Sequence, residues 1–244
     1  MGILDRVKDI SSLGQRNFWI IYGKSNSGKT HLAATFPKPM LYLQIGDDGS
    51  NTIANMEGIK AIRCSSLDEL KKAGIELKSD TKYKSVFVDT FSMITNVWVD
   101  QNVTAKKKQM TQQMWGNLKV ETEELIRIFH GISENHIVIL TCHEVMDSIE
   151  GMEDEILPDV RPSVSKGART YLEGMANYGL HTTKIQKTVV DKNGQEKEVV
   201  KFGIHLGANP YYWTKLQIDS SIKVPKLIIN PTYNKIMKYI NGGE

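Results

Sequence analysis

A glycine-rich segment, GKSNSGKT, occupies residues 23–30 and limits the folds that this chain can adopt. It matches the pattern G-x-x-x-x-G-K-[ST] at every required position, and it lies between an apolar run and a stretch of helix-forming residues. Glycines let the backbone approach a phosphate and adopt positive φ angles. Backbone N–H groups and the start of a helix then hold the anion. The segment therefore predicts a phosphate-binding loop between a buried strand and a helix.

Two side chains of this loop have an expected chemical task. Lys29 can reach the β- and γ-phosphates of a nucleoside triphosphate, and the hydroxyl of Thr30 can bind Mg²⁺. We expect ATP and Mg²⁺ as cofactors, although the absence of a guanine-reading N/T-K-x-D sequence is only weak evidence against GTP. The expected nucleotide-binding residues are Gly23, Lys24, Ser25, Asn26, Ser27, Gly28, Lys29, Thr30 and His31.

A carboxylate follows a second apolar run, Val86-Phe87-Val88. Mg²⁺ needs an oxygen ligand at the end of a strand adjacent to the strand of the phosphate loop. We therefore expect Asp89 to complete a metal site with Thr30. The alternative is that Asp89 caps the helix that follows it.

Hydrolysis also needs a group that orients or deprotonates the attacking water. Asp47 and Asp48, which follow the apolar run 40–45, are the best placed, and Glu144 is the alternative. Asp-Asp-Gly is also a good turn sequence, so turn formation is a competing interpretation. His143 ends a later strand, where it can sense the γ-phosphate by hydrogen bonding.

Apolar runs alternate with helical segments along most of the chain. Strands are predicted at 18–22, 40–45, 59–64, 85–89, 136–141, 180–190, 198–206 and 226–229. Helices are predicted at 31–36, 67–73, 116–134, 166–176 and 234–240. Asn193-Gly194 predicts a hairpin, and residues 145–165 are interpreted as irregular. The pattern predicts an α/β fold with a mostly parallel sheet, flanking helices and an antiparallel hairpin extension.

Length and composition limit the class of protein. A polar leader at 1–16 and one domain at 17–244 account for all 244 residues. The formal net charge of +3 is too balanced to indicate DNA binding by itself, so a DNA site must be a local patch. Cys64 and Cys142 are interpreted as reduced thiols, because no zinc spacing is present. No apolar stretch approaches the roughly 20 residues needed to span a bilayer, and we expect a cytoplasmic location without membrane contact.

Beyond the loop, the chain carries LYLQIGDDGS, SVFVDT, HIVILTCHE and the late hairpin, in that order. Together with GKSNSGKT, these segments resemble the RecA-like ATPase core, most closely that of small phage-encoded single-strand annealing and recombination proteins. The resemblance covers most of residues 18–230, and only the phosphate loop is highly specific. It implies an ATPase that acts on single-stranded DNA, self-associates into a ring or filament, and has a single-strand binding protein as a candidate partner. It also implies a location in the host cytoplasm if a phage encodes the chain.

The resemblance assigns roles to particular positions. It places Asp47 and Asp48 where the family has a catalytic glutamate, which implies slow hydrolysis, and it places His143 at a polar sensor. Of its two DNA-facing loops, the first contains Lys106, Lys107 and Lys108, which suit phosphate contacts. The second is mainly acidic, with basic residues only at its end: Arg161, Lys166 and Arg169.

A basic residue from a neighbouring subunit usually completes the site of RecA-like ATPases. Lys215, in YYWTKLQI, resembles that element and would stabilise the transferring phosphoryl group in trans. A solvated lysine on a strand is an equally good interpretation. Arg161 or Arg169 could serve instead.

Two other functions remain open from the sequence. One is a small-molecule or nucleotide kinase, although the region after Asp89 lacks the arginine-rich lid that such kinases usually carry. The other is a nucleotide-gated, non-catalytic DNA-binding or scaffold module, which the missing glutamate supports. Four aromatic residues could stack on bases, although packing is their more common use: Trp115, Tyr211, Tyr212 and Trp213.

Overall fold

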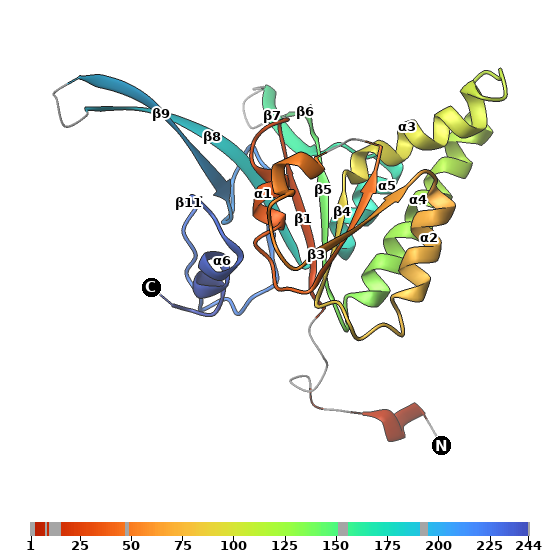
Figure 1. Ribbon diagram of the computed structural model, residues 1–244, viewed down its shortest axis with the longest axis horizontal. Helices are drawn as coiled ribbons and strands as arrows, with labels where there is room; N and C mark the ends of the chain where they lie inside the picture. Colours follow the sequence, from red (N-terminus) through yellow and green to blue (C-terminus); the bar gives the residue numbers. More distant parts are fainter. Residues whose placement is uncertain are drawn as a thin grey trace.

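A computed structural model describes residues 3–7, 9, 16–46, 49–150, 156–190 and 195–243. Its centre is a nine-stranded sheet with the order β11-β9-β8-β1-β5-β4-β2-β3, and β10 pairs with β8. Helices cover both faces of this sheet (Figure 1). The expected fold class, a mostly parallel α/β sheet with an antiparallel extension, is confirmed.

The parallel part of the sheet contains the strands that the apolar runs predict. Its members are β1 (Phe18–Gly23), β2 (Met40–Ile45), β3 (Ile59–Cys64), β4 (Ser85–Asp89), β5 (Ile137–Cys142) and β8 (Tyr178–Val190). The antiparallel part is formed by β9 (Glu196–His205), β10 (Lys215–Leu216) and β11 (Leu227–Ile229).

The strand order corrects one expectation about the metal site. The strand of Asp89, β4, is not adjacent to the strand of the phosphate loop, because β5 lies between β4 and β1. All three strands are parallel, so their carboxyl ends meet at one edge of the sheet. Asp89 therefore still reaches the loop, across the width of one intervening strand.

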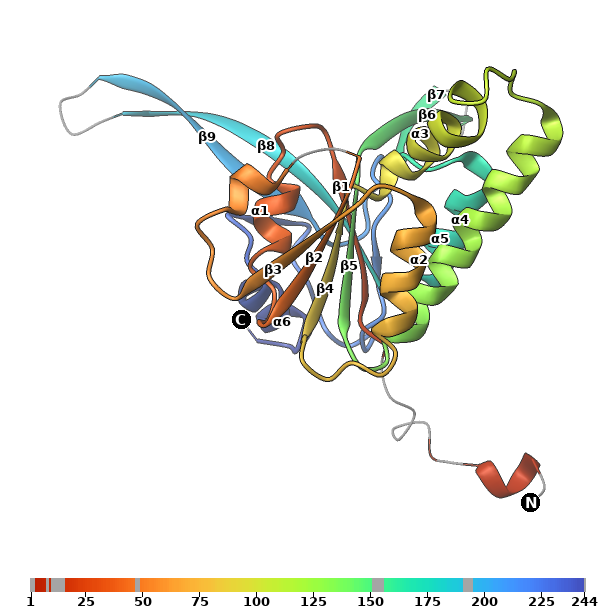
Figure 2. The same ribbon diagram turned by 45° about the vertical axis from the view of Figure 1, so that its right-hand side comes forward.

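The helices pack in two groups, one on each face of the sheet (Figure 2). On one face lie α2 (Leu67–Glu76), α3 (Ile94–Val99), α4 (Gln112–Ile132) and α5 (Lys166–Met175); on the other lie α1 (Lys29–Ala33) and α6 (Tyr233–Ile240). The Ser66 hydroxyl accepts a hydrogen bond from the Glu69 N–H, as expected for the cap of α2. The Thr111 hydroxyl caps α4, which therefore begins earlier than the sequence predicts.

Alternation along β1 explains how one strand serves both faces. Phe18, Ile20 and Tyr22 pack in the core beneath α2, α4 and α5, whereas Trp19 and Ile21 pack in the core beneath α1 and α6. All five side chains are fully buried. A central parallel strand must be apolar on both faces, because helices cover each of them.

Residues 145–165 do not form the irregular segment that the sequence suggests. They contain most of a two-stranded antiparallel sheet of β6 (Glu144–Glu150) and β7 (Ile156–Pro162). Proline disfavours a central strand, but β7 is an outer strand that meets the segment 211–213 through a single bridge at Val160, so its prolines interrupt no continuous ladder. Pro158 and Pro162 are therefore tolerated here.

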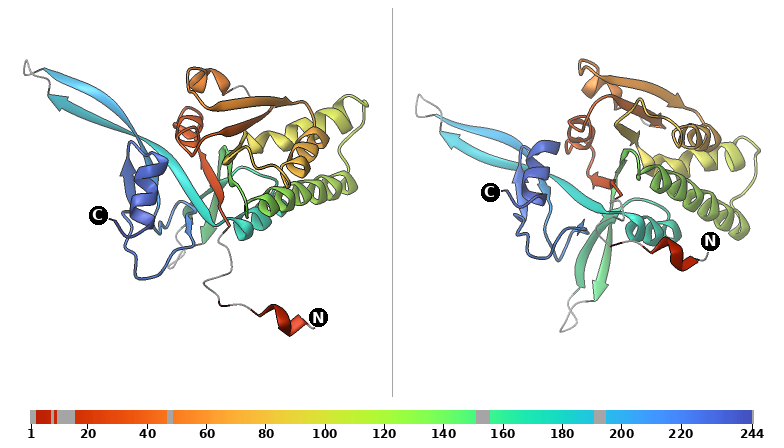
Figure 3. Two further views of the ribbon diagram at one scale, coloured as in Figure 1. Left: turned by 60° about the horizontal axis from the view of Figure 1, so that its bottom comes forward. Right: turned by 90° about the horizontal axis from the view of Figure 1, so that it is seen from below.

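The hairpin of β8 and β9 extends well beyond the rest of the sheet (Figures 1 and 3). We call its outer part, residues 184–190 and 196–202, the arm. The Asn-Gly turn that predicts this hairpin lies at 191–194, outside the described residues. The pairing of β8 with β9 confirms the hairpin itself.

Candidate nucleotide-binding site

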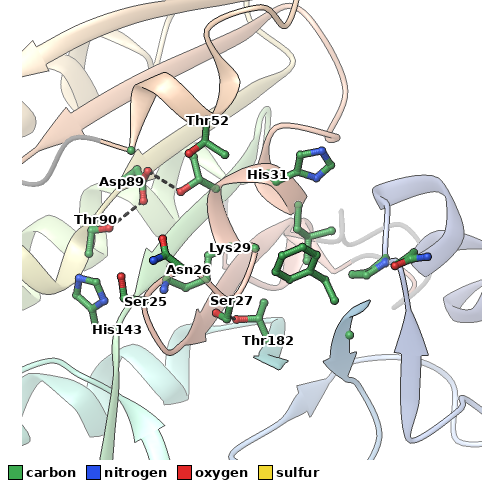
Figure 4. Close-up of a pocket in the computed structure, with 18 of the residues that line it drawn as sticks. Ser25, Asn26, Ser27, Lys29, His31, Thr52, Asp89, Thr90, His143 and Thr182 are labelled. Atoms are coloured by element: carbon green, nitrogen blue, oxygen red, sulfur yellow. Dashed lines mark hydrogen bonds between the residues drawn. The ribbon is translucent and has the colours of Figure 1, made fainter. Parts of the chain in front are cut away.

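A pocket of about 690 Å³ opens where β1, β4 and β5 end, beside Thr182 of β8 (Figure 4). This volume lies within the usual range for small-molecule sites. Phosphate-loop residues 25–30 and His31 line one part of it. Asp89, Thr90 and His143 line a second part, and residues from β9 and from the segment before α6 line a third.

The backbone of the loop requires its glycines. Gly28 has φ 89° and forms the N-cap of α1, and Asn26 has φ 58°. A side chain at Gly23 would place its Cβ only 2.6 Å from the carbonyl oxygen of Thr182. This close approach to β8 is why position 23 must be glycine.

A pair of hydroxyl groups fastens the loop to β8. Ser27 Oγ lies 2.5 Å from Thr182 Oγ1 and 2.7 Å from the carbonyl oxygen of Lys24. Thr182 Oγ1 also donates to the carbonyl oxygen of Tyr22 at 3.1 Å. The sequence carries no signal for Thr182, because its place beside the loop follows from the pairing of β8 with β1.

The ammonium group of Lys29 lies against the backbone of its own loop. Its Nζ donates to the carbonyl oxygens of Gly23 at 3.0 Å and Lys24 at 2.8 Å. The residue is only 7% exposed. The structure thus holds the charge beside the loop, where a bound phosphate group would interact with it.

Thr30 and Asp89 meet as the sequence predicts. Thr30 Oγ1 donates to Asp89 Oδ2 at 3.0 Å, and Asp89 is 3% exposed. Three further hydroxyls donate to the same carboxylate: Tyr42 at 3.2 Å, Thr90 at 2.8 Å, and Thr141. A hydroxyl beside a fixed carboxylate is an oxygen pair of the kind that Mg²⁺ prefers.

The competing interpretation of Asp89 as a helix cap is not supported. The short helix that follows begins after Thr90, with no side-chain cap hydrogen bond, and the N-cap of α3 is Met93. Instead, the neighbouring strands β2 and β5 contribute the hydroxyls that hold the carboxylate.

The two aspartates expected to activate water, Asp47 and Asp48, lie outside the described residues. The next residue, Gly49, is described, and it lies directly against Thr30 and Asp89. A Cβ on Gly49 would lie 2.7 Å from Asp89 Oδ2 and 3.2 Å from Thr30 Oγ1. The chain after β2 therefore returns to this end of the pocket, and Gly49 has no room for a side chain.

The structure places the other two predicted polar residues, His143 and Glu144, in different surroundings. His143 is half-buried and lines the pocket, and its N–H donates to Ser92 Oγ at 2.9 Å. Glu144 is not among the residues that line the pocket, because its Oε2 accepts a hydrogen bond from His181 Nε2 at 2.8 Å. The structure therefore does not favour Glu144 as the acid that activates water.

The loop, the hydroxyl–carboxylate pair and the strand order agree with a comparison against protein families. The model of a family described as an AAA domain matches residues 16–205. The chain belongs to this family. A search of curated proteins found no match. The family consists of P-loop ATPases, and the matched range contains the whole phosphate loop, Asp89 and the arm.

Beside the site of this AAA domain, His181 lies in a buried stack of rings. Its ring centroid lies 4.0 Å from that of Tyr212, which lies 4.5 Å from that of His205. Burial lowers the pKa of His181, although the hydrogen bond that its ring donates to Glu144 opposes the effect. His181 Nδ1 is buried without a hydrogen-bond partner among the described residues, which fits a neutral ring with its proton on Nε2.

Both predicted DNA-binding arginines of the AAA domain make ion pairs within the chain. Arg161 donates to Asp159 at 2.5 Å and to Glu173 at 2.8 Å. Arg169 donates to Asp147 at 2.5 Å. These contacts neutralise both guanidinium groups, so the structure does not favour a DNA-binding role for either.

The remaining predicted DNA contacts are exposed lysines in or next to the helices α4 and α5, which cover one face of the sheet. Lys166 begins α5. The other three lie together between the π-helical turn η5 (Asp100–Thr104) and α4, and they are Lys106, Lys107 and Lys108.

Lys215 has a role within its own chain. Its Nζ donates to the carbonyl oxygens of Glu173 at 2.9 Å and Gly174 at 2.8 Å, at the end of α5. A cation at this place satisfies the last carbonyl groups of the helix. The proposed role of Lys215 in a neighbouring subunit therefore stays a prediction, and it would require these bonds to break.

Packing explains two of the four aromatic residues that could stack on bases. Tyr212 belongs to the ring stack, and Trp213 packs against Gly179 and Tyr22. Trp115 and Tyr211 are exposed.

No helix within the described ranges is long and apolar enough to cross a membrane.

Proposed function

We propose that this AAA-family domain binds ATP with Mg²⁺, hydrolyses the nucleotide, and acts on single-stranded DNA. The observation that carries the proposal is the contact between Thr30 and Asp89 beside a complete phosphate loop. A hydroxyl, a buried carboxylate and a left-handed glycine at a helix start together suit a nucleoside triphosphate and its metal ion.

Each part of the pocket has a task in this proposal. Backbone N–H groups of residues 24–30 bind the phosphates, and Lys29 binds the terminal phosphate oxygens. Thr30 and Asp89 hold Mg²⁺, directly or through water, and the ion when bound offsets the negative charge of the phosphates. His143, at the pocket wall, hydrogen-bonds the γ-phosphate. Asp47 and Asp48 remain the proposed residues for positioning water.

Support for an anionic strand as partner comes from the arm. Residues directly opposite each other in an antiparallel pair lie on the same face. One face of the arm therefore carries Ile185 and Lys201, then Lys187 and Val199, then Val189 and Lys197. We call this the basic face.

The opposite face of the arm differs in charge. It pairs Lys184 with Phe202, Thr188 with Glu198, and Val190 with Glu196. The basic face contains three lysines and no acidic residue, whereas the other contains one lysine and two glutamates. Three lysines on a face without an acidic residue suit the phosphates of a single strand.

Self-association belongs to the same proposal. We propose that copies of the chain assemble on DNA as a ring or filament, and that a single-strand binding protein is a further partner. Electron microscopy with single-stranded DNA and a non-hydrolysable ATP analogue is the matching observation. Isolated monomers under all of these conditions would contradict the assembly.

The functional test is phosphate release from ATP by the full chain, with and without single-stranded DNA. Lys29→Ala removes the charge that binds the terminal phosphates, and we expect turnover to fall at least about 100-fold. Lys72→Ala is the matched control, since Lys72 is exposed on α2, outside the pocket. Wild-type turnover by Lys29→Ala would contradict hydrolysis at this site. Equal rates with and without DNA, together with no gel shift, would contradict the DNA half.

A further inference from the structure

The pocket is longer than the phosphate loop needs. Beyond Gly28 and His31 it continues to a wall of four residues that neither the loop nor the metal pair includes. One comes from the base of the arm, where β9 joins the rest of the sheet, and three come from the segment between β11 and α6. They are Phe202, Asn230, Pro231 and Thr232. We call these four residues the platform.

The ring of Phe202 lies directly on the phosphate loop. A Cβ built on Gly28 would lie 3.2 Å from Phe202 Cδ1 and 3.4 Å from Cγ, so only the absence of a side chain lets the two approach. Phe202 is nevertheless 41% exposed. A large aromatic ring that is partly open to a polar pocket offers a π-face to a flat ligand.

The rest of the platform is fixed by hydrogen bonds. The N–H of Asn230 donates to the carbonyl oxygen of Phe202 at 2.7 Å, and Asn230 has φ 48°. The hydroxyl of Thr232 accepts from the N–H of Lys235 and caps α6. A turn between β11 and α6 is thereby held against the strand that carries Phe202.

We propose that the platform binds the base of the nucleotide, with a purine ring stacked on Phe202 and its hydrogen-bonding edge at Asn230. The inference rests on the proposed binding of a nucleoside triphosphate. A phosphate loop contacts only phosphates and leaves the base unread, so selectivity must come from another part of the pocket. The side-chain amide of Asn230 offers one acceptor and donors, which match the amine and ring nitrogen of adenine. The site therefore prefers ATP to GTP.

Isothermal titration of the full chain with Mg·ATP, Mg·GTP and inorganic tripolyphosphate tests this assignment. Tripolyphosphate fills the phosphate loop without a base. Phe202→Ala should raise the Kd for ATP about 5- to 100-fold, the usual effect of losing one stacked ring. The same variant should leave the Kd for tripolyphosphate unchanged, and Phe202→Trp should restore ATP binding.

Two further variants sharpen the test. Asn230→Gly removes the amide while permitting the left-handed backbone, and it should reduce the preference for ATP over GTP. Val200→Ala is the matched control, because Val200 lies on the same face of β9 as Phe202 and is exposed, but does not line the pocket. It should bind all three ligands like the wild type.

The outcomes separate the platform from the function on which it rests. If Phe202→Ala binds ATP normally while Lys29→Ala does not, the platform is wrong and nucleotide binding stands. If Phe202→Ala weakens the binding of ATP and of tripolyphosphate by the same factor, the ring only stabilises the phosphate loop, and the proposed base stacking is overturned. If the wild-type chain binds neither ATP nor GTP, the proposed function fails and the platform fails with it.

Discussion

Individual side chains decide the chemistry of this pocket, and the sequence predicts only some of them. Lys29, Thr30 and Asp89 are predictable because each belongs to a spacing pattern with a known physical purpose. Tyr42 and Thr141, which donate hydrogen bonds to Asp89, are not, because their strands become its neighbours only in the folded sheet. Residues that reach the site only through the order of the strands have no recognisable pattern in the sequence around them.

His181 leads to a prediction at the same scale. Its burial lowers its pKa in the folded protein, with Glu144 opposing and Lys24 and Lys29 reinforcing the shift, and His205 stacks nearby. Below its ordinary pKa near 6.5, the unfolded chain binds a proton that the folded protein binds less readily. The free energy of unfolding should therefore be undiminished above about pH 6.5 and decline as the pH falls. One such histidine contributes at most about 1.4 kcal/mol per pH unit.

Urea denaturation at pH 7.5, 6.5 and 5.5 measures this effect. His181→Gln keeps a donor for Glu144 but cannot titrate. The variant should lose less stability than the wild type between pH 7.5 and 5.5. Identical losses in the two proteins would show that His181 does not carry the pH dependence.

At the scale of elements, the sequence predicts what local patterns encode and misses what pairing creates. The helix caps at Ser66 and the strands 40–45 and 85–89 follow from local signals, and the structure contains them. The sequence does not predict the hairpin of β6 and β7, because two prolines and many acidic residues are typical of a loop, and only the fold makes β7 an outer strand that tolerates prolines. The arm was predicted as a hairpin, but its two unlike faces emerge only from the register of β8 and β9.

The lysines of the basic face lead to a prediction about the affinity for single-stranded DNA. The triple variant of Lys187→Ala, Lys197→Ala and Lys201→Ala should bind single-stranded DNA more weakly. It should also reduce the slope of log K against log salt by about 0.7 for each lost phosphate contact, or about 2 in total. Fluorescence anisotropy over a range of salt concentrations measures both quantities.

Two controls locate the DNA-binding surface. Lys184→Ala changes the opposite face of the arm and should alter the slope much less. The alternative surface is tested by replacing the lysines of the η5–α4 segment, Lys106, Lys107 and Lys108, with alanine. If that variant loses the salt dependence and the arm variant keeps it, DNA binds at the η5–α4 segment instead of the arm.

In the whole molecule, the arm connects the two proposed sites. Phe202 lies at the pocket, and the adjacent Lys201 lies on the basic face, so one strand passes between the base and the DNA surface. Coupling between two sites is reciprocal, so DNA that favours one arm position would change nucleotide affinity by the same factor as nucleotide changes DNA affinity. The two strands of the arm could be predicted from the sequence, but the approach of the arm to the phosphate loop could not, because it results from the pairing of residues 178–182 of β8 with β1.

We propose above that Thr30 and Asp89 form the Mg²⁺ site of a bound nucleotide. The most direct measurement is the affinity for ATP with and without Mg²⁺, in the wild type and in Asp89→Asn, which keeps the side-chain shape. Asp68→Asn on the exposed surface of α2 is the control, and thermal unfolding confirms that each variant is folded. We predict that Mg²⁺ lowers the Kd for ATP in the wild type and in the control. In Asp89→Asn, the factor by which Mg²⁺ lowers this Kd should be smaller by at least about tenfold. An equal increase in ATP affinity from Mg²⁺ in all three proteins would contradict the assignment of Asp89 to the Mg²⁺ site.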